Sequence, residues 1–217
     1  MTYDVGMTVI ETRAPLNRDR IIDAAVRFAD QHGADELLMR KLGAELGVEA
    51  MSLYNHVANK DEILDGMIDH VFTTIPLPDP KQDWRVSVRT TGLAAMEQFT
   101  AHPWVVSLLM QRGNFGNASL VFMNQVLGIL RAAGFSDEET HHAWQMLASH
   151  TMGYAFQQSS GSWHDKDWEG LEDQLSRLGD RLPHVAALAP LLAQCEFGSE
   201  YAFGLEIIIG GLEARLG

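Results

Sequence analysis

The chain has 217 residues, of which 46% are hydrophobic and 21% are charged. This composition suits one medium or two small globular domains and excludes a chain that is disordered throughout. No apolar run approaches the roughly 20 residues that span a bilayer, and the first residues lack the basic-then-apolar pattern of a signal peptide. The single cysteine, Cys195, cannot form an intrachain disulfide or a cysteine-based zinc site. We therefore expect a cytoplasmic protein.

The formal net charge of −13 gives no support to a nucleic-acid partner. Residues 1–75 hold seven Lys or Arg against thirteen Asp or Glu, and the remainder holds nine against sixteen. Both parts would repel DNA by their overall charge. A DNA-binding function would therefore need a local motif that gathers the few cations on one face.

The hydrophobic periodicity predicts an all-α protein, because no alternating strand pattern is present. Residues 1–16 lack a sustained period and are predicted to form a flexible arm. Helical patterns follow at about 17–33, 39–46, 50–57 and 60–74, the first capped by Asn17 and ended by Gly33.

The sequence PLPDPKQD at 76–83 marks a domain boundary, since its prolines interrupt any period. Longer helices are predicted beyond it at about 84–101, 103–113, 117–133, 137–158 and 199–216, with Ser136 and Glu139 as a capping box. We thus predict a small helical domain at 17–75 and a larger one at 76–217.

The most informative segment is MRKLGAELGVEAMSLYNHVANKDEIL at residues 39–64. Its apolar residues have the spacing of two short helices packed across a tight turn at Gly47: Leu42, Leu46, Val48, Leu53 and Val57. This is the pattern of a helix-turn-helix, in which the second helix can lie in a major groove.

Burying Leu53 and Val57 leaves a polar and aromatic set exposed, which can reach phosphates and base edges: Met51, Ser52, Tyr54, Asn55 and His56. Lys60 begins the next helix, where its charge and the free N–H groups could address one phosphate. Arg40 lies at the start of the first helix of the motif. Short helices joined by a glycine also occur as plain packing, so spacing alone leaves both readings open.

Residues 18–72 resemble the N-terminal domain of the tetracycline-repressor (TetR) family. The marks are RDRIIDAAVRFADQHG and the segment above, especially the run from Leu53 to Lys60. The remainder is similar to the ligand domain of that family in AHPWV at 101–105, LRAAGFS at 130–136 and the terminal FGLEIIIGGLEARL. The resemblance implies a transcriptional regulator, usually a repressor, that binds a palindromic operator as a homodimer and is released by a small molecule.

Matching positions imply specific DNA contacts. The family pattern implies phosphate contacts from Tyr54, His56 and Lys60. It implies operator contacts from four further residues: Arg40, Met51, Ser52 and Asn55. The chain departs from the family at Leu38 and Glu49, where Ser or Thr often caps a helix, so the local capping is in question.

A homodimer is also expected because one short recognition helix reads too few base pairs for useful specificity. The expected interface combines the last helix with the long helix from Asp137. Its last-helix residues are Phe203, Ile207, Gly210 and Gly211. The alternative is that the last helix is an ordinary core helix.

The helices from residue 84 to 158 carry more aromatic, Met and polar side chains than a plain core requires. Those predicted to bind a ligand are Thr91, Phe99, Met110, Met123, His141 and Trp144, with Met96, Phe122 and Thr151 beside them. Such stripes more often form ordinary core, but the resemblance implies a cavity between these helices.

The expected effector is not a metal-chelated tetracycline. The metal-ligating histidine of the family falls on Met110 here, and a thioether is a poor magnesium ligand. We therefore expect no metal or other cofactor, and a largely apolar effector, with aromatic compounds included. It would favour a conformer in which the helix at 60–74 pivots near Thr74 and the recognition helices leave the groove spacing, which needs a preference of about 5 kcal/mol.

No catalytic set is found. His141 and His142 are adjacent and face different directions, and His150 lies two turns from His142, too far for a three-histidine metal site. The alternative function is an all-α enzyme or metal-binding bundle with an incidental helix-turn-helix. DNA binding without stoichiometric metal would decide against it.

Overall fold

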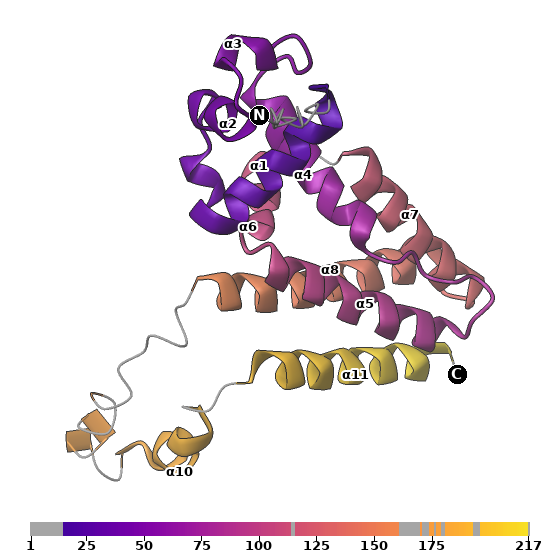
Figure 1. Cartoon of the computed structure of the whole chain (residues 1–217). Helices are drawn as coiled ribbons and strands as arrows, with labels where there is room; N and C mark the ends of the chain where they lie inside the picture. The colour runs from indigo at the N-terminus through magenta and orange to yellow at the C-terminus, as the bar shows by residue number, and fades with distance from the viewer. Residues whose placement is uncertain are drawn as a thin grey trace, which may run out of the picture.

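The structure is a computed structural model that describes residues 15–113, 116–160, 170, 174–175, 177–178, 181–192 and 196–216. All of its described elements are helices, as predicted (Figure 1). The predicted arm lies outside the described residues except for its last two positions. No helix among the described residues is long and apolar enough to span a membrane.

The N-terminal helices follow the predicted pattern closely. Helix α1 (Arg18–His32) begins at Asn17, whose side chain accepts a hydrogen bond from the Arg20 backbone, and it ends at Gly33. A short 3-10 turn, η1 (Ala34–Glu36), leads to α2 (Met39–Leu46), α3 (Ala50–Leu53) and α4 (Lys60–Thr74). The buried faces of α1 and α4 pack together, and α2 and α3 close the end of this unit.

The second half is built from longer helices. They are α5 (Trp84–Ala101), α6 (Trp104–Arg112), α7 (Asn117–Ala132), α8 (Asp137–Ser159), α10 (Pro183–Leu192) and α11 (Phe197–Leu216). The capping box predicted from Ser136 and Glu139 is present at the start of α8. Helix α11 packs on α5 and α8, and two ion pairs tie it to α5: Arg85 with Glu213, and Arg89 with Glu206.

Three details differ from the sequence prediction. Helix α3 ends at Leu53 rather than near Val57, because the chain continues as a tight turn in which His56 and Val57 both donate backbone hydrogen bonds to the Leu53 carbonyl. Asn117 is the first residue of α7 and not its cap, since the carboxylate of Asp69 binds the free N–H groups there instead. The sequence prediction gave no bounds for α10, and none of the residues of this helix is buried.

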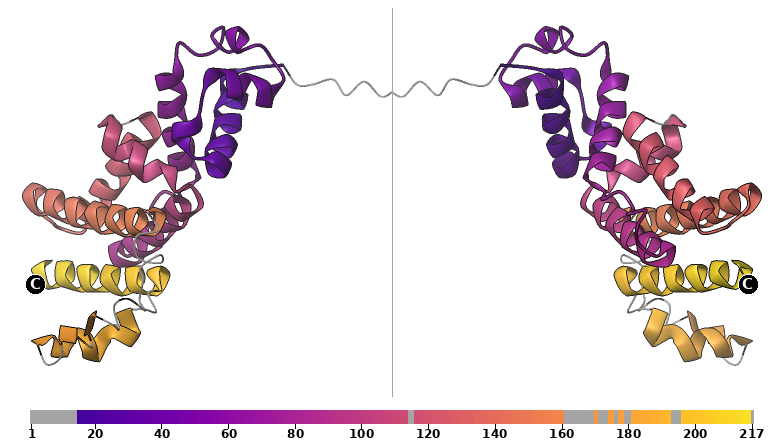
Figure 2. Two further views of the ribbon diagram at one scale, coloured as in Figure 1. Left: turned by 90° about the vertical axis from the view of Figure 1, so that its left-hand side faces the viewer. Right: turned by 90° about the vertical axis from the view of Figure 1, so that its right-hand side faces the viewer.

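Helix α4 joins the two halves. It packs against α1 on one side and against α6 and α7 on another, so its buried residues belong to a core cluster that continues from α1 to α11. The side views show α2 and α3 at one end of the molecule and α11 toward the other (Figure 2). A change in the second half can therefore reach the first through one rigid element.

Candidate nucleic-acid interface and ligand cavity

The turn between α2 and α3 has the predicted geometry. Gly47 adopts the left-handed conformation, with φ of 65° and ψ of 41°. Its backbone N–H donates to the Ala44 carbonyl and that of Val48 donates to the Gly43 carbonyl, which completes the C-terminus of α2. Leu42, Leu46 and Leu53 are buried beneath the turn. The two helices are thus held in fixed relation.

Neither α2 nor α3 has a side-chain cap, as the departures at Leu38 and Glu49 suggested. Lys41, in the first turn of α2, instead forms an ion pair with Glu36 of η1. The packing of Leu42 and Leu53, rather than capping, holds these short helices in place.

Gly43 allows α3 to approach α2. A Cβ atom at Gly43 would lie 2.9 Å from the Val48 carbonyl oxygen and 3.1 Å from the Ala50 nitrogen, and both are backbone atoms that cannot rotate away. We expect Gly43→Ala to lower the free energy of unfolding by about 1–3 kcal/mol, measured by chemical denaturation, and to weaken DNA binding.

Gly128→Ala is the matched control. Gly128 is an exposed residue in α7, and a Cβ atom there would meet no atom within 4 Å. The helix propensity of alanine should leave the stability of this variant unchanged or raise it by up to about 1 kcal/mol. Equal stability of the Gly43→Ala variant and the parent would contradict the close approach of the two helices.

The residues predicted to contact DNA lie on one exposed surface around α3. Met51 is 73% exposed and Tyr54 is 44% exposed, whereas Leu53 between them is fully buried. Ser52 is half-buried, and Asn55, His56 and Arg40 are exposed. The structure therefore leaves all of these side chains at least partly accessible to a partner.

Lys60 is the first residue of α4, beside the free backbone N–H groups of that helix terminus. The Asn59 side chain accepts a hydrogen bond from the Glu62 backbone at 2.9 Å, which fixes the start of the helix. The Glu62 carboxylate in turn accepts from the Ala58 backbone N–H at 2.7 Å and from Arg18 Nε at 3.0 Å. The Ala58 bond and then Arg18 lower the pKa of Glu62, so this brace is present at neutral pH.

The ion pairs of the described residues engage Arg18 and Lys41 but leave Arg40 and Lys60 without a carboxylate partner. Three of the acidic side chains of α4 bind groups of the second half. Asp61 and Asp65 bind Arg112 of α6, and Asp69 caps α7. These three carboxylates are thereby engaged away from the surface around α3.

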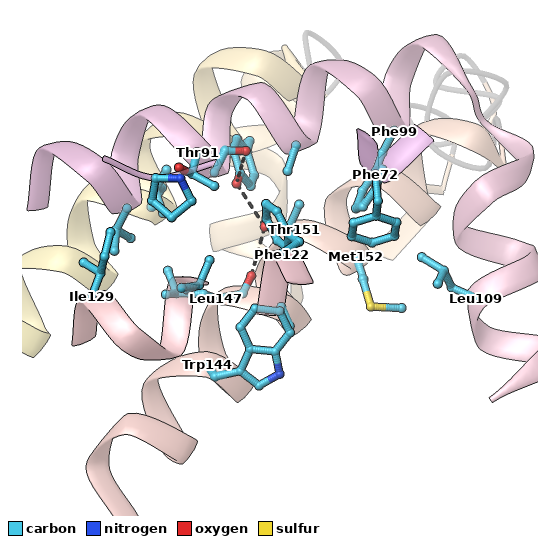
Figure 3. A pocket seen from close by; sticks show the side chains of 18 of the residues that line it. Phe72, Thr91, Phe99, Leu109, Phe122, Ile129, Trp144, Leu147, Thr151 and Met152 are labelled. Carbon is cyan, nitrogen blue, oxygen red and sulfur yellow. Dashed lines mark hydrogen bonds between the residues drawn. The ribbon is translucent and has the colours of Figure 1, made fainter. Parts of the chain in front are cut away.

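The second half contains a cavity of about 190 Å³ between α4, α5, α7, α8 and α11 (Figure 3). Four aromatic side chains form a chain of edge-packed rings on its wall: Phe99, Phe72, Phe122 and Trp144. None of the lining residues carries a formal charge at neutral pH. The polar side-chain groups of its lining residues are the hydroxyls of Thr91, Thr151 and Tyr201 and the indole N–H of Trp144.

Of the six residues predicted to bind a ligand, Thr91, Phe99 and Trp144 line this cavity. Met110 does not, because it is 63% exposed on α6 while its neighbour Leu109 points inward. Met123 and His141 line a separate surface hollow between α7 and α8. Met96 is buried in the core, and Phe122 and Thr151 line the cavity.

Tyr201 was not identified from the sequence as a cavity residue. It lies on α11 with 1% of its surface exposed, and its hydroxyl bonds to the Gly92 carbonyl of α5 at 2.9 Å. Burial raises the pKa of this hydroxyl, which stays protonated at neutral pH. A sequence signal for it existed only in the helical register, which places Tyr201, Leu205 and Ile209 on the buried face of α11.

The opposite face of α11 is apolar and exposed. Phe203 is 70% exposed and Ile207 is 60% exposed, and Gly210 and Gly211 follow on exposed positions. On α8, Met146 is 50% exposed, whereas the exposed Phe156 lies at a hollow lined by residues of α1 and α6. An exposed apolar surface of this kind is typical of a protein–protein interface.

Polar contacts link the cavity half to the N-terminal half. Arg112 at the end of α6 donates from Nε to Asp65 at 2.7 Å and from Nη1 to Asp61 at 2.8 Å. Asp30 of α1 accepts from Trp104 Nε1 at 2.7 Å and contacts His102 Nδ1 at 2.8 Å. Helix α4 itself contributes Phe72 to the cavity wall and Lys60 to the opposite terminus, about 18 Å away along the helix axis.

Among the described residues, no group of three or more histidine, cysteine or acidic side chains is placed so that it could hold a metal ion. His141 and His142 are exposed, and their rings lie at a tilted angle with centroids 5.6 Å apart. His150 is used elsewhere, since its Nε2 contacts the Tyr201 carbonyl at 2.9 Å and its ring stacks on that of Tyr201.

Comparisons with known proteins agree across both halves. Residues 21–67 match the bacterial regulatory proteins of the tetR family, and residues 77–216 match the tetracyclin repressor-like C-terminal domain. The chain is 31% identical to the HTH-type transcriptional repressor DrrR1 of Streptomyces coeruleorubidus, over 98% of this chain and 83% of that protein.

Solved structures show the same arrangement. The Streptomyces coelicolor TetR family protein ActR in complex with actinorhodin is 32% identical with a TM-score of 0.79, covering 93% of this chain and 97% of that one. The structure of BioQ with its natural double-stranded DNA operator is 25% identical with a TM-score of 0.59, covering 83% of this chain and 100% of that one.

Proposed function

The chain belongs to the TetR family of bacterial regulatory proteins and is a ligand-responsive DNA-binding repressor, and on this basis we propose that it binds a palindromic operator as a homodimer and is released by a small, largely apolar effector. The members of this family are transcriptional regulators. One observation carries the proposal: a single helix, α4, runs from the exposed surface around α3 to the wall of an apolar cavity.

The DNA contacts that we propose divide into two groups. Tyr54, His56 and Lys60 bind phosphates: Tyr54 and His56 are exposed, and Lys60 is the first residue of α4, whose N-terminus favours an anion. The residues that address the base edges and the flanking backbone are Arg40, Met51, Ser52 and Asn55. Their exposure, and the absence of a carboxylate beside Arg40 among the described residues, support this assignment.

The homodimer would form through the exposed apolar face of α11 together with α8. Phe203 and Ile207 are four residues apart on that face, and Gly210 and Gly211 allow a second helix to approach closely. Dimerisation would place two recognition surfaces on one duplex, which a palindromic operator matches.

The effector would bind in the cavity, where the solved ActR structures with bound small molecules support a ligand role for this half of the fold. Because no lining residue is charged, the ligand is expected to be uncharged, and no metal is required. Ligand contacts to Phe72 and Leu109 would shift α4 and α6 relative to the other helices around the cavity. This shift would alter the spacing between the recognition surfaces of the two copies of the chain.

The function can be tested with the purified chain and DNA from the region flanking its gene. We expect a gel shift with one palindromic fragment, competition by that fragment alone at moderate salt, and no stoichiometric metal in elemental analysis. Stoichiometric metal together with no DNA binding would instead favour the alternative of a metal-binding helical bundle.

Arg112 is expected to transmit the effector signal, because it joins the end of α6 to two carboxylates of α4. In Arg112→Met, a cavity ligand chosen from a panel of aromatic compounds by thermal stabilisation should still bind. Its effect on operator affinity should fall by about fivefold or more, since typical coupling free energies are about 1–3 kcal/mol. Fluorescence anisotropy measures the operator affinity with and without the ligand. The ratio of these two affinities is then compared between the variant and the parent.

Arg131→Met is the control for Arg112→Met. Arg131 pairs with Asp137 at 2.9 Å across the α7–α8 connection and contacts no part of α4 through this pair. The ratio of operator affinities without and with the ligand should be the same in Arg131→Met as in the parent. An unchanged ratio in Arg112→Met would show that the signal takes another route.

A further inference from the structure

Two hydroxyl groups lie within hydrogen-bond distance of each other in the largely apolar cavity. Thr151 Oγ1 of α8 lies 3.0 Å from the Tyr201 hydroxyl of α11. Thr151 Oγ1 also lies 2.9 Å from the Leu147 carbonyl, and the Tyr201 hydroxyl lies 2.9 Å from the Gly92 carbonyl. Figure 3 shows the resulting line of hydrogen bonds passing through Thr151 beside Phe122 and Leu147.

The pair has fewer hydrogens than contacts. Two hydroxyl hydrogens serve three contacts, and each hydroxyl oxygen has two lone pairs. Whichever oxygen donates to the other, both hydrogens can be used within the line, while most of the lone pairs stay unused. A ligand that donates a hydrogen bond therefore adds an interaction, whereas a ligand that only accepts must first displace one.

The position of Tyr201 is fixed from several sides. Its ring stacks on that of His150, with centroids 4.8 Å apart, and Tyr154 packs edge-on against both rings. Gly92 leaves room for the hydroxyl, since a Cβ atom there would lie 3.1 Å from the Tyr201 oxygen. The hydroxyl pair is thus a pre-organised acceptor and not a mobile surface group.

The rest of the cavity defines the remainder of the ligand. The chain of rings from Phe99 to Trp144 favours a planar aromatic partner. An engineered apolar cavity of about 150 Å³ accepts benzene, so a cavity of about 190 Å³ suits a compound of one or two fused rings.

We propose that the Thr151–Tyr201 hydroxyl pair is the polar end of the effector site, and that it selects uncharged aromatic ligands that donate a hydrogen bond. This inference rests on the proposed function, in which the cavity holds the effector. It adds a specificity-determining pair that bridges α8 and α11, and it favours phenol-like or N–H donor rings over isosteric rings that lack a donor.

Three isosteric probes test the inference: indole, which donates through N–H, benzofuran, which has only a ring oxygen, and indene, which has neither. Dissociation constants for the full chain are measured by calorimetry without DNA. We expect indole to bind about three- to tenfold more tightly than benzofuran or indene. In Thr151→Val combined with Tyr201→Phe, the advantage of indole should fall to one or below, because both hydroxyl acceptors of the pair are then absent.

Two further variants guard against a general loss of structure. Thr151→Ser keeps the hydroxyl and should keep the advantage of indole. Thr140→Val alters a buried threonine of α8 that does not line the cavity and should also keep it. Equal binding of the three probes to the parent, no binding of any of them, or an advantage that survives in the double variant would overturn the proposal. The calorimetric measurements contain no DNA. They therefore test the ligand preference independently of whether the chain binds an operator.

Discussion

Replacing Phe203 and Ile207 together by glutamate is expected to convert the dimer into monomers and to weaken operator binding by at least about a hundredfold. The two side chains are 70% and 60% exposed on the outer face of α11, while Tyr201 and Leu205 on the inner face hold the helix in the fold. Carboxylates on the outer face would have to be buried, unpaired, in the interface. Losing the linkage between two half-sites removes an avidity that typically amounts to a factor of 10² to 10⁴.

Light scattering measures the mass and anisotropy measures the operator affinity. Leu120→Glu is a suitable control, because Leu120 is a similarly exposed apolar residue on α7, away from α11. It should remain dimeric with the affinity of the parent. A parent chain that is monomeric at micromolar concentration, or a double variant that stays dimeric, would show that this face is not the interface.

Lys60→Ala should lower the affinity for specific and random DNA alike by about tenfold or more at low salt, because two charge-assisted phosphate contacts are lost per dimer. The slope of log K against log salt should become shallower by about two per dimer. Tyr54→Phe should weaken both kinds of binding with little change in slope, since it removes a hydroxyl and not a charge. Replacing Ser52 or Asn55 should instead change the preferred sequence.

Lys81→Ala provides the comparison for Lys60→Ala. Lys81 is an exposed cation between α4 and α5, outside the surface around α3. Its removal changes the net charge equally but should leave the salt slope nearly unchanged. If the two lysine variants behave alike, Lys60 acts through the overall charge and does not bind a phosphate.

The sequence predicted the helices well where a local signal was strong. Asn17, Gly47 and the Ser136–Glu139 pair are cap or turn residues whose effect is confined to a few neighbours, and each has the expected geometry. The end of α3 was placed too late because Val57 continues the apolar spacing although the backbone has already turned. Apolar spacing reports burial, and a tight turn can bury a residue as well as a helix can.

The cavity was harder to predict because it depends on helical register. Leu109 points inward and the adjacent Met110 outward, and likewise Phe122 lines the cavity while Met123 lies at a different hollow. One residue corresponds to a rotation of about 100° around the helix axis. The hydroxyl pair was beyond sequence reasoning, since Thr151 and Tyr201 are 50 residues apart and meet only through tertiary packing.

The acidic charge of the N-terminal half also needed the structure for its interpretation. Asp30, Asp61, Asp65 and Asp69 all bind groups of the second half, so they hold the two halves together and do not face the proposed DNA surface. A count of charges along the chain cannot separate these two locations. These four carboxylates therefore add to the net charge of the chain while they serve as contacts between its two halves.

The central claim is that two copies of this chain read one palindromic duplex. Selection of binding sites from a pool of random DNA duplexes with the purified full chain tests it most directly. We predict enrichment of a single inverted repeat whose half-site centres are separated by about 10 base pairs or a multiple of that spacing. Enrichment of an isolated half-site, or no enrichment at all, would contradict it.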